Sequence, residues 1–153
     1  MTNLHINNAT RSTAVMAFDS EQILRNVYAQ SALQVAGRIT SPKSFQLLSP
    51  DHAKLLRNVL ANAYVCVCAP LAGYIHNIDI EHLEDGECTI ELITNASNGK
   101  FCISVLRMML EKAVALYVLA EVFRVEDGKM NLAETYRNDF NIQLRLITQY
   151  LAR

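Results

Sequence analysis

The sequence predicts a mainly α-helical protein of about four helices, with a two-stranded antiparallel β-hairpin between the second and the third. Apolar residues recur at helical spacing in four separate stretches, and the period changes to two at about residues 77–94. The 153 residues are enough for one domain with its own core. We therefore expect a single domain over residues 18–153.

A flexible N-terminal arm is expected over residues 1–17, because this stretch is rich in Asn, Thr and Ser and has few apolar anchors. The first helix should begin after Phe18, where Asp19 can cap it and Gln22 can complete a variant capping box. Gly37 is a typical stop for this helix.

The second helix has a strong start signal in Ser49-Pro50-Asp51, with a hydroxyl at the cap, proline at the first position and an acid near the positive end of the helix dipole. Pro70 should end or kink it, because the proline ring removes a backbone donor.

The hairpin is predicted from two runs of alternating residues. Ile78 and Ile80 alternate with acids, and Glu84-Asp85-Gly86 supplies a turn. In the second run, Cys88, Ile90 and Leu92 alternate with Thr89, Glu91 and Ile93. An isolated hairpin is marginally stable. It must therefore pack on helices or extend into a sheet with a neighbouring subunit.

The third helix is expected at about residues 100–125, and its segment 112–123, KAVALYVLAEVF, is apolar on every face. A helix of this kind must be covered on more than one side. We expect a second copy of the chain to supply part of that cover, although the other helices of the same chain are an alternative. The predicted oligomer interface consists of Ala115, Val118, Val122, Ile78, Ile80 and Ile93.

The fourth helix should follow the break at Glu126-Asp127-Gly128, with Asn131 and Glu134 as a capping pair. Residues such as Gln143 are expected on its water-facing side. Aromatic residues at helical spacing should pack the third helix on the fourth. They are Tyr117, Phe123, Tyr136, Phe140 and Tyr150.

Composition disfavours several classes of function. The 14 Lys and Arg residues nearly balance the 15 Asp and Glu residues, so there is no basic field to hold a nucleic acid backbone. The longest low-polarity runs, 63–75 and 113–122, are shorter than the roughly 18 residues typical of a membrane span. The N-terminus lacks the pattern of a secretory signal, so we expect a cytoplasmic product with no membrane contact.

No catalytic, phosphate-binding or cofactor-binding motif occurs, so we expect a non-enzymatic protein without a cofactor. Cys66 and Cys68 are one residue apart in an apolar run and are expected to pack as small hydrophobic residues. The histidines are scattered, which disfavours a metal site. The acids around the hairpin are expected to form a solvated face.

Three segments in the C-terminal half resemble a known group. They are the paired-strand segment IDIEHLEDGECTIEL, the helix LEKAVALYVLAEVF and the closing helix AETYRNDFNIQLRLITQYL. Together they resemble the small neck proteins of tailed bacteriophages, the head–tail connector, adaptor and tail-completion group, including those of phages and prophages of Bacteroides-type bacteria. The resemblance implies a structural virion protein, assembled in the host cytoplasm, that forms a ring of copies between portal and tail.

In such a ring the partners are the portal and other neck or tail proteins, and DNA only passes through the channel. Two other classes of function remain open. One is a small cytoplasmic ligand-binding or regulatory domain with a pocket lined by Tyr64, Cys66, Met108 and Met109. The other is an enzyme that uses Asp79 and Glu81, or His76 and His82.

Overall fold

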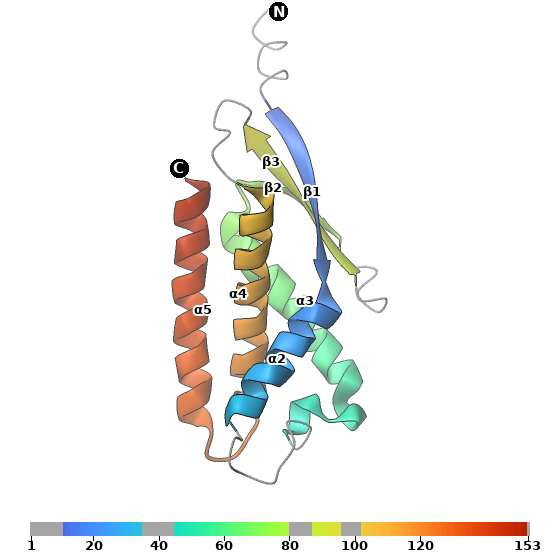
Figure 1. The fold of residues 1–153 in the computed structure, drawn as a ribbon, viewed down its shortest axis with the longest axis vertical. Coiled ribbons are helices and arrows are strands. Elements are labelled where there is room, and N and C mark those ends of the chain that lie inside the picture. Colours follow the sequence, from blue (N-terminus) through green and yellow to red (C-terminus); the bar gives the residue numbers. More distant parts are fainter. Residues whose placement is uncertain (1–10, 35–44, 80–86, 96–101, 153) are drawn as a thin grey trace, which may run out of the picture.

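The computed structural model describes residues 11–34, 45–79, 87–95 and 102–152 (Figure 1). These residues form four α-helices, namely α2 (Ser20–Gln34), α3 (Ala53–Cys68), α4 (Ile103–Arg124) and α5 (Met130–Leu151). They also form three strands, namely β1 (Arg11–Asp19), β2 (Ile75–Asp79) and β3 (Glu87–Asn95). The mainly α fold with an antiparallel strand pair between the second and third helices is thus confirmed.

The sheet has a third strand that the sequence did not predict. Its order is β1-β3-β2, and both outer strands run antiparallel to β3. β1 pairs with β3 from Arg11 opposite Asn95 to Asp19 opposite Glu87. The expectation of a free arm through Ala17 was therefore wrong for residues 11–17, because β3 supplies the hydrogen-bond partners that this segment lacks locally. Residues 1–10 lie outside the described part of the chain.

The predicted start of the first helix and the predicted end of the second are close to the observed ones, whereas Gly37, the predicted stop of the first helix, lies outside the described residues. The Gln22 backbone N–H donates to Asp19 Oδ1 at 3.1 Å, so Asp19 caps α2 as expected. Before α3 there is a short 3₁₀-helix, Pro50–His52, and the Ser49 hydroxyl bonds the Gln46 carbonyl oxygen at 2.9 Å instead of capping. α3 ends at Cys68, two residues before Pro70.

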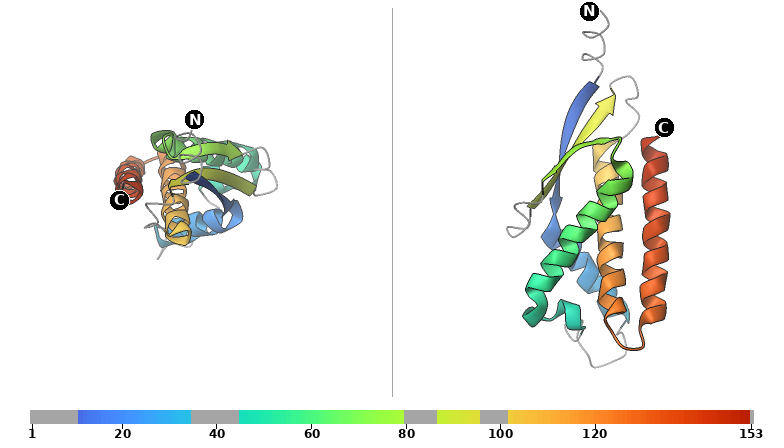
Figure 2. Two further views of the ribbon diagram at one scale, coloured as in Figure 1. Left: turned by 90° about the horizontal axis from the view of Figure 1, so that it is seen from above. Right: turned by 180° about the vertical axis from the view of Figure 1, so that it is seen from behind.

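α4 is the central element of the fold. It contacts α2, α3, α5 and β1 (Figure 2), and these elements cover it from several sides. Residues along its second half are at most 1% exposed, namely Val114, Val118, Leu119, Val122 and Phe123. The premise that one chain cannot cover this helix was therefore wrong, because the chain's own helices bury it.

α4 and α5 pack against each other through aromatic pairs, as predicted. The rings of Tyr117 and Phe140 lie 5.5 Å apart edge to face, and those of Phe123 and Tyr136 are stacked at 5.5 Å. The Cys102 backbone N–H donates to the Tyr150 hydroxyl at 2.7 Å, which joins the start of α4 to the end of α5.

The water-facing prediction for Gln143 was wrong, since this side chain is 5% exposed. Its amide donates to the Met109 carbonyl oxygen at 3.1 Å, so the buried polar group has a partner on α4. The predicted capping pair of the fourth helix was also wrong. α5 begins at Met130, and its cap position is Lys129, which makes no side-chain cap.

Across the described residues, none of the helices combines the length and the apolar character that crossing a membrane requires.

Candidate functional site

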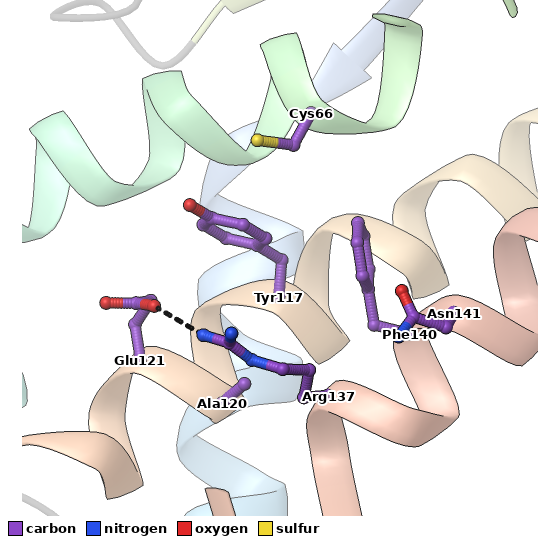
Figure 3. Close-up of a pocket in the computed structure, with 7 residues that line it drawn as sticks. All are labelled: Cys66, Tyr117, Ala120, Glu121, Arg137, Phe140 and Asn141. Carbon is purple, nitrogen blue, oxygen red and sulfur yellow. Dashed lines mark ion pairs between the residues drawn. The ribbon is translucent and has the colours of Figure 1, made fainter. Parts of the chain in front are cut away.

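A pocket of about 340 Å³ lies where α3, α4 and α5 meet (Figure 3). Tyr117 and Glu121 project into it from α4, Cys66 faces it from α3, and Arg137 reaches it from α5. Ala120, Phe140 and Asn141 complete the lining. The pocket therefore combines aromatic surface with a thiol, a phenol, an amide and an ion pair.

The ion pair in the pocket is centred on Glu121, whose side chain is 15% exposed. Its Oε2 lies 2.7 Å from Arg124 Nη2, and its Oε1 lies 3.7 Å from Arg137 Nη2 (Figure 3). The hydrogen bond to Glu121 raises the pKa of Arg124 further. Two guanidinium groups thus pair with one carboxylate, and of these two arginines only Arg137 lines the pocket.

Tyr117 stays a neutral phenol in this pocket. Partial burial raises the pKa of its hydroxyl, and the hydrogen bond with the Cys66 thiol acts in the same direction. With the Glu121 carboxylate paired with two arginines, the Tyr117 hydroxyl, the Cys66 thiol and the Asn141 amide are the other polar side-chain groups that line the pocket.

The pocket that the sequence predicted is not formed by its four residues. Tyr64 is fully buried, and its hydroxyl is 2.8 Å from Ser20 Oγ. Cys66 lines the pocket just described, whereas Met108 lines a different groove. Tyr64 and Cys66 are only two residues apart on α3, so the helix turns their side chains to different sides. The prediction of one shared pocket was therefore wrong.

The second groove, of about 510 Å³, runs between α2 and α5 with α4 as its floor. Met108 in its lining is 68% exposed, and Val105, three residues earlier on α4, is 43% exposed. On α5, Ile142 and Leu146 follow the lining residue Asp139 at helical spacing and are also exposed. We call Val105, Met108, Ile142 and Leu146 the apolar strip.

The residues of the predicted oligomer interface fall into two groups. Ala115, Val118 and Val122 are 8%, 0% and 0% exposed within a single chain, so the helical part of the interface was wrong. Ile78 lies opposite Ile90 in the sheet, and Ile93 lies opposite Thr13. Ile80 lies outside the described residues, and the strand part of the interface stays a prediction.

Of the four residues considered for an enzyme, two lie in the part of the chain that the structure describes. Asp79 ends β2 and His76 lies within it, whereas Glu81 and His82 lie outside the described residues. Among the side chains that the structure does place, no three His, Cys, Asp or Glu residues gather as a metal site would require.

The cysteines differ in environment, which predicts an order of reactivity. Cys102 is exposed at the N-terminus of α4, where the backbone N–H groups of Val105 and Ser104 lower the pKa of its thiol. Burial raises the pKa of Cys68 to about 12. In alkylation by iodoacetamide at pH 7.5, followed by peptide mass spectrometry, Cys102 should react before Cys68 by a large factor. Equal rates for the two thiols in the native protein would contradict this arrangement, and equal rates in urea are the control.

The fold is mainly helical, and its central helix contacts three helices and the first strand of a three-stranded antiparallel sheet. Comparison with known families finds no matching family model, and comparisons with curated proteins and with solved structures find no match.

Proposed function

We propose that the chain is a structural, non-enzymatic protein of a tailed bacteriophage neck, where a ring of copies joins the portal to the tail and lets DNA pass. The observation that carries the proposal is the arrangement of the C-terminal half. The strand pair β2–β3, the long helix α4 and the closing helix α5 carry the resemblance to neck proteins, and all of them contribute residues to one hydrophobic core. The resemblance therefore rests on elements that exist together in space.

The buried face of α4 is not available as the wall of such a ring, so the contact between copies has to come from other surfaces. A ring needs a heterologous contact, in which two different surfaces of the same chain meet. The two outer strands of the sheet, β1 and β2, provide two different surfaces for such a contact, and the apolar strip provides a third. Contacts between copies through these surfaces leave the hydrophobic core of each copy intact.

The charge balance is compatible with a channel for DNA. The formal net charge of the chain is −1, so a ring of copies has no large positive field that would bind the phosphate backbone by releasing counterions. DNA would then pass through the ring without binding tightly to its wall.

The experiment is to purify the chain with the portal protein of the same phage or prophage and to image the mixture. We expect rings seated on the portal in negative-stain images and a mass in solution that matches a closed assembly. Two variants are compared in this assay: Met108→Lys changes a residue of the apolar strip, and Gln149→Lys changes an exposed residue outside the strip. If the strip joins the copies, only Met108→Lys should reduce ring formation. A well-folded chain that never binds the portal or a neighbouring neck protein would overturn the proposal.

The pocket between α3, α4 and α5 favours a second candidate, a small ligand-binding or regulatory domain. Its lining of Tyr117, Glu121 and Arg137 joins an aromatic wall to charged groups, as ligand sites commonly do. A small molecule that stays bound to the purified chain in native mass spectrometry, and that is lost in Tyr117→Ala but kept in Leu33→Ala, would favour this candidate. An empty pocket in the freshly purified protein would count against it.

A further inference from the structure

The outer edge of β1 is one of the two edges of the three-stranded sheet. β1 is an outer strand, and no further strand lies beyond it among the described residues. An outer strand presents a row of backbone donors and acceptors that another strand can satisfy. We propose that β1 pairs antiparallel with β1 of a second copy around a two-fold axis, which joins two three-stranded sheets into one.

β1 lacks the features that usually protect such an edge. Its sequence, RSTAVMAFD, has neither proline nor lysine, and it pairs with β3 along its whole length without a bulge. Val15, at its centre, is 68% exposed. The other outer strand is different, because β2 has only 5 residues and its register shifts between Ile75 and Asn77. The two edges therefore differ in how readily they accept a partner strand.

The opposite charges at the two ends of β1 favour a second copy of β1 as the partner strand. In an antiparallel pair of identical strands, the register centred on Val15 is the one that pairs all 9 residues. It places Arg11 opposite Asp19 of the partner subunit at both ends, and Val15 opposite the partner's Val15 in the middle. Opposite charges across a strand pair stabilise it, as does contact between β-branched side chains. The same strand is thus complementary to itself.

Asp19 is available for this contact. Its carboxylate accepts the cap hydrogen bond from Gln22 and lies 3.8 Å from Arg25, yet its side chain is 61% exposed. By contrast, pairing of β1 with β2 of another copy would join a strand of 9 residues to a shorter one with an irregular register.

The two-fold pair does not rest on the proposed function. It uses one surface twice, whereas a ring uses two different surfaces. If the chain forms a ring through the edge of β1, the pair is the form of the free protein, and it opens before the ring closes.

The test uses disulfide formation in the full chain. In a background with Cys66→Ser and Cys102→Ser, which removes both exposed thiols, Val15→Cys is compared with Val65→Cys, whose site on α3 is 49% exposed. Directly opposed residues have Cα atoms about 4.5–5.5 Å apart, within the range that a disulfide spans. With oxidised glutathione, Val15→Cys should give on the order of tenfold more linked dimer than Val65→Cys, because pairing raises the effective concentration of the two thiols.

The register is tested by mixing single variants. Thr13→Cys mixed with Ala17→Cys should form more linked dimer than either variant alone, since the proposed register places residue 13 opposite residue 17 of the partner. The mass of the unmodified chain in analytical ultracentrifugation should rise towards two copies with concentration, and Val15→Lys should abolish that rise while Val65→Lys does not.

Linking of Val15→Cys at the level of Val65→Cys would overturn the proposal, whatever the outcome with the portal. A Val15→Lys chain that stays monomeric yet still forms rings would support a pair that is separate from ring assembly. Loss of rings in Val15→Lys, together with background linking of Val15→Cys, would instead assign the edge of β1 to a head-to-tail contact.

Discussion

Replacement of Val118 by aspartate is expected to unfold the chain instead of separating folded subunits. Val118 is fully buried in α4, between elements of its own chain. The change removes an apolar side chain from the core and places a carboxylate there without a partner, which together cost at least about 4 kcal/mol. Domains of ordinary stability have only about 5–15 kcal/mol in total, so most or all of the native state should be lost.

Circular dichroism and urea denaturation measure this effect. Val118→Ala is the milder variant and should lower the free energy of unfolding by about 2 kcal/mol while the chain stays folded. Val65→Asp is the matched control, because Val65 is 49% exposed on α3, and it should change stability by less than about 0.5 kcal/mol. A folded Val118→Asp chain of reduced mass and unchanged stability would show that this face contacts another subunit.

Phe123→Ala should have the second largest effect among the predictions. Phe123 is fully buried, its ring lies 5.0 Å from Phe45 edge to face, and it stacks on Tyr136 at 5.5 Å. This one side chain joins α4 to α5 and to the segment before α3. We expect the free energy of unfolding to fall by about 3–5 kcal/mol, the range for large aromatic residues in a core.

The measurement is the urea midpoint together with the melting temperature, which should fall on the order of 10 °C for a chain of this size. Leu33→Ala removes a large apolar side chain that is 66% exposed, and it should leave both quantities nearly unchanged. A Phe123→Ala variant that unfolds at the same urea concentration as the parent would mean that the aromatic contacts of α4 contribute little.

The helices could be predicted from the sequence because their signals are local. Asp19 caps α2, and the turn around Pro50 precedes α3. The break near Gly128 separates α4 from α5, and Gly128 has a φ of +73°, which favours glycine. Each signal lies within a few residues of the boundary that it marks.

β1 could not be predicted because its partner is distant in the sequence. Residues 14–18 are all apolar, so the alternation that reveals a half-buried strand is missing, and the preceding residues are polar. Its pairing joins Arg11 to Asn95, which no local pattern reveals. The inference about α4 failed for another reason. The rule that an apolar helix needs cover on several sides was correct, but three helices of the same chain provide most of that cover.

The pocket at Cys66 and Arg137 was also beyond sequence analysis. Its residues come from three helices, and only Cys66 was considered as pocket lining. The closest signal was the aromatic spacing that correctly placed Tyr117 and Phe140 at the contact of α4 and α5. Which helix would pack on the remaining side of that contact depends on the whole fold.

The pairing of β1 with β3 also matters for synthesis on the ribosome. β1 is complete at Asp19, but its partner is complete only at Asn95, so the nascent strand waits on the order of ten seconds at usual rates of translation. During that time a flexible, aggregation-prone segment is accessible to chaperones. A translation product that stops before residue 87 never receives the partner strand, and we expect it to be cleared by proteolysis or to aggregate.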